Sequence, residues 1–406
     1  MTFSTVTFQK NAIDQIEALD TSISQTQNQL SSGTMLPNAA ANPVGMTEVN
    51  ELNAQLSASQ QYVTNGNSAT ANLQLEESAL TSATNLLQSA QTLATQANSG
   101  SLNSSDLQDI GTQLEQQLQQ LTDVANSTDT NGQYLFSGQA SNTQPFAQSG
   151  NTVTYSGSDT VDQIEIGPNQ FISAGDTGSS VFMNVPTGNG TFTTAAAAGN
   201  TGSGSIDPGT VTDPSAWVPG TYTITFTSPT QYEITDTTTG NPVQLGTDGS
   251  GNPVYTANYT SGDGISFDGI QVTISGTPAT GDQFTVAPAG KTSAFSTLSN
   301  LVTALNSTSL TSAQRTTQIE GALQQLDNAV NQLNDVQASV GARINAVTTA
   351  QSSASSQQTT LQTSISQLSD TDYAAATTQL STEEIALQAA EQSYASIAKL
   401  SLFSYL

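Results

Sequence analysis

The sequence contains no cysteine and no histidine among its 406 residues. A Ser-His-Asp triad, a Cys-His pair and the common zinc sites are therefore excluded, and disulfides cannot stabilise the fold. Positive charge is also scarce, with 5 Lys and Arg against 32 Asp and Glu and a formal net charge of -27. A chain this acidic offers no cationic face for nucleic acid or for an anionic membrane surface.

Long apolar runs and targeting signals are absent as well. No stretch of about 20 apolar residues is present to span a bilayer. The N-terminal segment MTFSTVTFQKNAIDQIEALD has no basic n-region and no apolar h-region, so we predict no cleavable signal peptide. Charged residues make up only 9% of the chain, and the surface must therefore consist mainly of Ser, Thr, Asn and Gln.

The composition divides the chain into three blocks. Residues 1–139 and 291–406 are rich in Gln, Leu and Ala with helical periodicity, whereas residues 151–290 are rich in Thr, Gly and Pro with strand-like alternation. This order predicts a mainly α fold, an elongated antiparallel helical bundle or coiled-coil rod built from both chain ends. An all-β domain, a sandwich or open barrel, is inserted into it. We expect terminal helices at 1–33 with 371–406, a bundle core with a short hairpin at 44–150 with 291–370, and the insert at 151–290.

The strongest pattern is a heptad repeat in the third block. Apolar residues recur at every seventh position through Leu326, Leu333, Val340, Val347, Ala354, Leu361 and Leu368. A second seam through Leu323, Val330, Ile344 and Ile365 is interrupted by Gln337, Gln351 and Gln358. Paired seams at a spacing of 3.5 residues predict a coiled-coil helix, in which the glutamines set the register at some cost in stability.

The first block supplies helical partners for this seam. One stripe consists of Leu107, Ile110, Leu114, Leu118, Leu121 and Val124, and a capping box with Ser105 as N-cap and Gln108 at N3 precedes it. After this helix, NGQYLFSG carries an Asn-Gly turn signal, which predicts a short hairpin.

Several segments of the middle block alternate as strands do. GTYTITF places Tyr222, Ile224 and Phe226 on one face, and ISFDGIQVTISG gives two strands with a turn or bulge at Gly269. Residues 194–213 are poor in apolar side chains, and we expect an exposed loop there.

Both ends of the chain carry amphipathic helical patterns. The apolar residues near the N-terminus are Ile13, Ile16, Leu19, Ile23 and Leu30. Those near the C-terminus are Tyr373, Leu380, Leu387, Tyr394, Ile397, Leu400, Leu402, Phe403 and Leu406. Two such helices form a thin hairpin, which buries too little surface to offset a backbone entropy of about 1–2 kcal/mol per residue. We therefore predict that these residues form an assembly interface and that the ends become ordered when neighbouring subunits bury them.

Particular segments resemble the flagellin superfamily. They are LSSGTMLPNAAANP, ANSGSLNSSDLQDIGTQLEQQLQQLTDVANST, SVGARINAV and DTDYAAATTQLSTEEIALQAA. Within the superfamily, NGQYLFSGQASNTQPF, GDQFTVAP and the ending SLFSYL are similar to the hook-associated proteins of the hook–filament junction.

The resemblance implies a structural adaptor in the bacterial flagellum. It would be an extracellular, flagellin-like protein that is secreted without a cleavable signal peptide, and its terminal helices would form the inner tube of the hook–filament junction. Its partners would be further copies of itself in a ring, flagellin, the hook-side hook-associated protein and a flagellar export chaperone. We predict no catalytic residues, no metal ligands and no cofactor.

Two alternatives remain open from the sequence. Filament flagellin is the nearer one, and it would grow filaments on its own. An enzyme is the other, and without His and Cys it would need a convergent carboxylate pair, Lys or Ser/Thr chemistry. The Asp and Glu residues are scattered along the chain, and no such pair is evident in the sequence.

Overall fold

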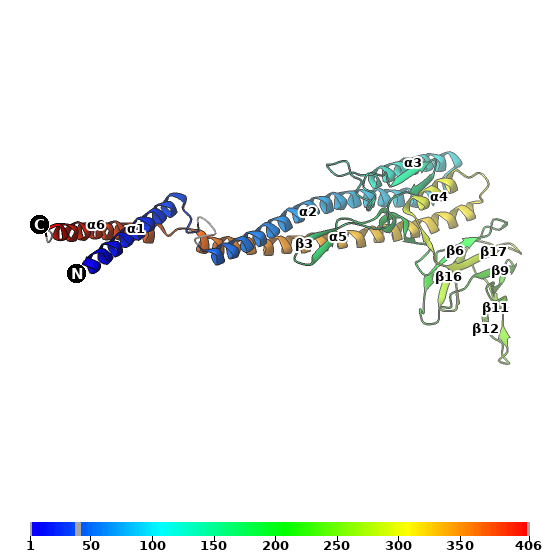
Figure 1. Ribbon diagram of the computed structural model, residues 1–406. Coiled ribbons are helices and arrows are strands. Elements are labelled where there is room, and N and C mark those ends of the chain that lie inside the picture. The colour runs from blue at the N-terminus through cyan, green and yellow to red at the C-terminus, as the bar shows by residue number, and fades with distance from the viewer. Residues whose placement is uncertain (1, 37–41, 404–406) are drawn as a thin grey trace. The chain divides into compact units, whose positions relative to one another are not determined.

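A computed structural model describes residues 2–36 and 42–403 of the chain. Helical regions at both ends flank a central, antiparallel β-rich region (Figure 1). The helices are α1 (Thr2–Ser32), α2 (Pro43–Ala97), α3 (Ser104–Ala125), α4 (Ala294–Asn306), α5 (Ser312–Ser369) and α6 (Tyr373–Phe403). The predicted fold class, helical at both ends with an inserted β region, is confirmed.

The chain divides into two compact units. The terminal unit contains Met1–Gly66, Ile166–Pro168 and Thr349–Leu406, and the central unit contains Asn67–Glu165 and Asn169–Thr348. Helices α2 and α5 contribute residues to both units, and the central unit holds helices as well as strands. The three-part division that we expected from the sequence remains a prediction.

The helical core of the central unit contains the predicted stripes of α3 and α5 together with leucines of α2. Leu73, Leu80 and Leu87 of α2 are fully buried, as are Leu114, Leu118 and Leu121 of α3. On α5 the heptad positions Leu326, Leu333, Val340 and Val347 are buried, and Ala354 and Leu361 continue the seam in the terminal unit. The period-3.5 pattern thus identified the residues of α5 that pack against neighbouring helices.

Two of the seam glutamines reach polar partners on α2. Gln337 donates to the Thr81 hydroxyl at 3.2 Å in the central unit, and Gln351 donates to the Val63 carbonyl at 3.4 Å in the terminal unit. Ser59 adds a hydrogen bond of 3.0 Å to the Ala354 carbonyl. These pairings support the hypothesis that polar groups set the register of α2 against α5.

The predicted start of α3 is wrong by two residues. Asn103, not Ser105, is the N-cap, and its side chain accepts from the amides of Ser105 (2.8 Å) and Asp106 (3.0 Å). Asp106 returns the interaction by accepting from the Asn103 amide at 3.0 Å. Both Asn103-to-Asp106 and Ser105-to-Gln108 have the spacing of a capping box, but the carboxylate favours the first because it also stabilises the helix N-terminus.

The expected short hairpin in NGQYLFSG is present only as one antiparallel bridge, and its turn is not of the type that Asn-Gly favours. This segment forms a loop held by one isolated bridge between Thr128 and Tyr134. A type I′ turn needs positive φ at both central residues, but only Gly132 has it, at +80°. Instead, the Asp129 carboxylate accepts from the amides of Asn131 and Gln133 at 2.8 Å each and closes the loop.

This loop leads into a buried aromatic cluster. Phe146 packs on Phe295 of α4 with ring centroids 5.0 Å apart and on Phe182 at 5.6 Å. Phe136, from the end of NGQYLFSG, meets Phe182 edge to face at 5.3 Å. Such offset and edge-to-face pairs add to the energy of apolar burial, so the cluster fixes the loops to the helical core.

The β elements are mostly short and antiparallel. Besides one turn of π-helix, η1 (Ser179–Met183), they are β1 (Phe146–Ser149), β2 (Thr152–Tyr155), β3 (Gln163–Gly167), β4 (Gln170–Ser173), β5 (Val185–Pro186), β6 (Phe192–Ala196), β7 (Ser205–Ile206), β8 (Thr210–Val211), β9 (Tyr222–Ser228), β10 (Gln231–Asp236), β11 (Asn241–Pro242), β12 (Gly246–Thr247), β13 (Pro253–Val254), β14 (Thr256–Asn258), β15 (Gly264–Phe267), β16 (Ile270–Ser275), β17 (Gln283–Pro288) and β18 (Lys291–Thr292).

Two of the sheets share one hydrophobic core. The larger has the order β11-β10-β9-β17-β6 with β14 beside β10, and the smaller has the order β15-β16-β7 with β8 beside β16. Tyr222, Ile224 and Phe226 of β9 are buried, as the alternation predicted, and they cluster with Val272 and Ile274 of β16. The arrangement matches the sandwich alternative.

The expectation of an exposed loop at 194–213 is wrong. This segment contains β7 and β8 and the end of β6, and Ile206 is 1% exposed in the core. The strands were missed because two-residue strands pair through tertiary context and leave no alternating pattern in the sequence.

A prediction concerns the turn between β15 and β16. Gly269 has φ +79°, and a Cβ there would overlap the Asp213 carbonyl oxygen, whereas Gly251 has φ +82° and open space around it. Gly251→Ala should cost about 1 kcal/mol for the left-handed backbone alone. Gly269→Ala should cost about 3 kcal/mol, because the neighbouring backbone must also move. Denaturant unfolding of both variants measures the difference, and equal losses would contradict the packing at Gly269.

Candidate assembly interface

The terminal helices α1 and α6 lie side by side in the terminal unit (Figure 1). Ile23 of α1 and Ala376 of α6 are buried between them, at 8% and 7% exposure. Both helices follow the amphipathic pattern of their sequences, so each turns one apolar face to the other.

A polar contact lies inside this hairpin. Thr26 is buried, and its hydroxyl lies 3.0 Å from both the Ser22 carbonyl and Glu383 Oε2. Gln379 donates to the other carboxylate oxygen of Glu383 at 2.9 Å. A buried threonine that meets a carboxylate favours one register of α1 against α6, and it replaces apolar area that would otherwise hold the pair together.

Residues 33–35, which follow α1, are hydrogen-bonded to residues 369–371, which precede α6. We call these two paired segments the joint. Gly33 ends α1 with φ +72°, and Thr34 forms a bridge with Asp370. The Thr371 amide donates to the Gly33 carbonyl at 3.0 Å, and the Met35 amide donates to the Ser369 carbonyl at 2.6 Å. The Thr371 hydroxyl adds a bond of 3.2 Å to the Gln29 carbonyl.

Helix α6 begins directly beyond this joint. The Asp372 carboxylate accepts from the amides of Ala374 and Ala375 at 3.0 and 3.1 Å. The side chain thereby satisfies amides of the first turn that have no partner within the helix. The start of α6 is thus fixed by Asp372, directly after Thr371, which is hydrogen-bonded to Gly33 at the end of α1.

Most residues of the predicted interface are incompletely buried. Ile16, Leu19, Leu30, Leu380, Leu387 and Tyr394 are half-buried. Ile13 and Tyr373 are exposed, at 41% and 56%. Ile397, Leu400, Leu402, Phe403 and Leu406 were also predicted, and their side chains lie outside the described residues. Within the described part of the hairpin, therefore, the α1–α6 pair leaves much of its apolar stripe facing outward.

Sequence reasoning missed one exposed apolar residue of α6, Ile385, which is 66% exposed. Two residues along an α-helix are separated by about 200°, so Ile385 lies on the face opposite Leu387. A spacing of seven residues marks only one stripe of α6, so it did not indicate the apolar residue on the opposite face. Each face of α6 therefore carries apolar area, and α1 can cover only one of them.

Other kinds of site find little support in the described residues. Among residues 2–36 and 42–403, no helix is long and apolar enough to cross a membrane, and no cluster of Asp and Glu is arranged to hold a metal ion. The loop at Asp248 is closed by its own hydrogen bonds, since the carboxylate accepts from the amides of Ser250 and Asn252 at 2.8 Å each.

The sequence reading found no convergent carboxylate pair, and the structure corrects this. Glu76 and Asp176 come together in the central unit, where the Asp176 amide donates to Glu76 Oε1 at 3.0 Å. The two residues are 100 positions apart, and no local motif links them. A cavity that Glu76 and Gly175 line has a volume of about 100 Å³, which is room for a few water molecules.

Comparisons with known proteins agree with this architecture. The pattern described as "Bacterial flagellin N-terminal helical region" matches residues 3–141, and "Bacterial flagellin C-terminal helical region" matches residues 323–406. A third, the D2-like domain of flagellar hook-associated protein 1, matches residues 195–288. Together these matches define a flagellin-like protein with an inserted β domain.

Individual relatives narrow the class. Flagellar hook-associated protein 3 of Salmonella typhimurium is 30% identical over 157 residues, 39% of this chain. That alignment spans 49% of the relative, so the chain spans about half the length of this curated relative, and the same holds for the Escherichia coli protein. FlgL of Xanthomonas campestris, known from a crystal structure, is 32% identical in sequence to this chain. The two structures superpose with a TM-score of 0.69, and the match covers 78% of this chain and 99% of that one. Hook-associated protein 3 of Legionella pneumophila is 30% identical with a TM-score of 0.73, over 79% and 98%. The chain belongs to the family of flagellar hook-associated protein 3, FlgL.

A prediction concerns the joint. Thr371→Val keeps the shape of the side chain and removes the donor to Gln29, which should weaken the joint by about 1 kcal/mol. The amides of Met35 and Thr371 should then exchange about fivefold faster with deuterium. Thr377→Val is the matched control, because Thr377 is exposed and bonds only within its own helix, to Tyr373 and Ala374. Equal exchange in both variants would contradict the role of Thr371.

Proposed function

We propose that this chain is a structural adaptor subunit of the bacterial flagellum, which joins the hook-side hook-associated protein to the flagellin filament. Membership of the FlgL family supports this role over that of filament flagellin. One of the similar solved structures, from Legionella pneumophila, is described as a flagellar junction protein. It is 31% identical to this chain and covered over 99% of its length.

The observation that carries the mechanism is the incomplete burial of the terminal hairpin. Exposed apolar area on α1 and α6 is stabilising only when neighbouring subunits remove it from water. We infer that the two ends become ordered on docking, with further copies of the chain beside them in a ring. One end of the ring would contact the hook-side protein and the other the first flagellins, so the protein would act through adhesion and not through catalysis.

Composition supports the same role. With 9% charged residues and a net charge of -27, copies of the chain approach most closely through uncharged Ser, Thr, Asn and Gln surfaces. We further propose that the protein is secreted unfolded through the flagellar channel and that an export chaperone covers the C-terminal apolar segment beforehand. Without a cysteine, no disulfide has to form or break along this route.

A gene deletion tests the adaptor role. Cells that lack the protein should keep intact hooks, lose their filaments and release flagellin into the medium. Normal filaments on the deletion strain would contradict the proposal. Purified protein that grows long filaments by itself would instead favour filament flagellin.

A second test removes the end of the chain. A variant that lacks residues 400–406 should be secreted with its central unit folded, because none of these residues belongs to that unit. It should fail to restore filaments to the deletion strain, since the apolar end can no longer be buried by neighbours. Normal filaments with this truncation would rule out the role of the C-terminal residues.

Substitutions on α6 test the exposed face more finely. Ile385→Ser should leave the stability of the monomer within about 0.5 kcal/mol, because Ile385 contacts mainly water there. It should nevertheless reduce filament attachment, because burial of an isoleucine contributes about 1.5–3 kcal/mol per subunit interface. Gln388→Ser is the matched control, an exposed polar position on the same helix. A sedimentation assay of assembled rings and a count of filaments per cell provide the measurement, and equal behaviour of both variants would contradict burial of Ile385.

A further inference from the structure

A small ionic cluster with one buried member, Glu76, lies in the central unit. Glu76 lies on α2 and is 2% exposed, Asp176 lies between β4 and η1, and Arg343 lies on α5. Arg343 forms an ion pair with the Asp176 carboxylate and donates to the Gly175 carbonyl at 3.1 Å. Arg343 belongs to SVGARINAV, so this motif holds the segment around Asp176 against the helices.

The charges in this cluster do not balance if both carboxyl groups are ionised. Two carboxylates would then share one guanidinium, and a buried charge without compensation is strongly destabilising. Glu76 Oε2 and Arg343 Nε have no hydrogen-bond partner within the described residues. The ionised form of Glu76 is favoured only by the Asp176 amide at 3.0 Å and by the charge of Arg343, which is already paired with Asp176.

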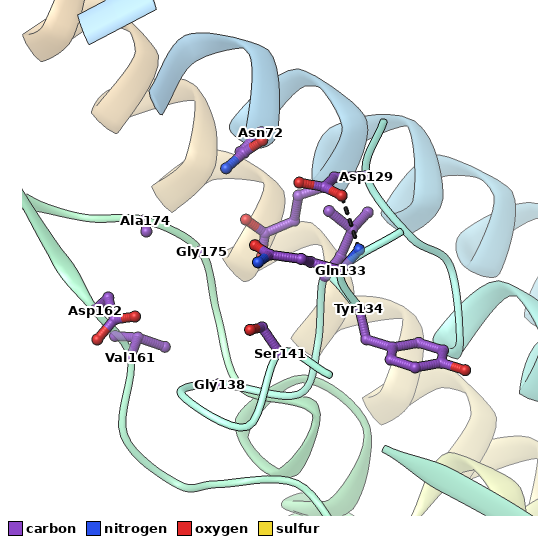
Figure 2. A pocket seen from close by; sticks show the side chains of 12 residues that line it. Asn72, Asp129, Gln133, Tyr134, Gly138, Ser141, Val161, Asp162, Ala174 and Gly175 are labelled. Atoms are coloured by element: carbon purple, nitrogen blue, oxygen red, sulfur yellow. Dashed lines mark hydrogen bonds between the residues drawn. The ribbon is translucent and has the colours of Figure 1, made fainter. Parts of the chain in front are cut away.

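The surroundings add further negative charge. Glu76 is one of the residues that line a small cavity, and Figure 2 shows Asn72, Asp129, Gln133 and Asp162 around this cavity. Every charged residue that lines this cavity among the described residues is acidic. The Asp129 carboxylate accepts from loop amides, and Asp162 accepts from Gln139 at 3.0 Å.

We propose that Glu76 holds a proton beside the ion pair of Asp176 and Arg343, and that this proton fastens residues 174–178 to α2 and α5 until alkaline pH removes it. The fastening extends into the aromatic cluster, because the Gly178 amide donates to the Phe136 carbonyl at 2.7 Å. The proton is therefore part of what positions NGQYLFSG on the helical core. This inference does not depend on the function proposed above.

The direction of the pH effect follows from the burial of Glu76. Burial, and next the charge of Asp176, raise the pKa of Glu76 from 4.5 to about 8, although Arg343 opposes the shift. The folded protein thus binds this proton at pH values where the unfolded chain has lost it. The contribution to stability is complete below about pH 4.5 and is lost as the pH rises through about 8.

Denaturant unfolding of the full chain between pH 5 and 9 tests the proposal. Glu76→Gln keeps the shape of the side chain and is neutral at every pH, so the stability of wild type relative to this variant should fall with rising pH. The folding constant of wild type should fall relative to the variant by up to about tenfold per pH unit until the pKa of the folded state is reached. Glu77→Gln, at the exposed neighbouring position, should keep the wild-type slope. Equal slopes for wild type and Glu76→Gln would overturn the proposal.

Two further measurements keep the test decisive if Glu76→Gln does not fold. Infrared spectra of wild type should retain the absorption of a protonated carboxyl group at pH 7 and lose it above about pH 8, and its loss below pH 6 would overturn the proposal. In Asp176→Asn, Glu76 faces Arg343 without a competing carboxylate, so the protonated absorption should disappear at least one pH unit lower. An unchanged transition in Asp176→Asn would overturn the claim that the charge of Asp176 helps to hold the proton on Glu76.

Discussion

Each terminal helix has two apolar faces or a wide apolar stripe, and one partner helix can cover only part of it. Ile23 and Ala376 are buried between α1 and α6, but Ile13, Tyr373 and Ile385 face outward. The buried face itself contains Thr26 against Glu383, which fixes the register and contributes little apolar area. The hairpin is consequently specified in geometry but weak in energy, and we propose that other subunits bury its remaining surface.

The central unit, in contrast to the terminal hairpin, buries its apolar residues within one molecule. Its helices bury complete leucine stripes, and five aromatic rings tie the loops of NGQYLFSG to α4 and η1. The joint at Gly33, Thr34 and Asp370 lies where α1 ends and just before α6 begins, and its backbone hydrogen bonds hold these two helix ends together. A stable body with adhesive ends is what a subunit needs if it travels as an unfolded chain and acquires its final order on docking.

The parts of the fold that were predictable from the sequence are those governed by periodicity. The heptads of α5 and the alternation of Tyr222, Ile224 and Phe226 lead directly to buried faces, because a regular helix or strand repeats its direction at a fixed spacing. Three features were not predicted. The sequence offers two equivalent capping signals, and the Asn103 cap was not the one chosen. The burial of Ile206 depends on tertiary pairing, and the exposed Ile385 lies on a helix face that the seven-residue repeat does not mark. The pairing of Glu76, Asp176 and Arg343 was inaccessible for a related reason, since its members come from three distant segments that only tertiary structure unites. The predicted interface residues themselves remain a prediction, although their exposure is the pattern that such an interface requires.

Hydrogen exchange of the monomer in dilute solution tests whether the α1–α6 hairpin needs neighbouring subunits to be stable. We expect residues 2–30 and 372–403 to exchange at rates near those of an unfolded chain, whereas the core helices of the central unit should be protected. The same terminal residues should become protected in assembled rings. Strong protection of both terminal helices in the isolated monomer would contradict the account, because the hairpin would then be stable without neighbours.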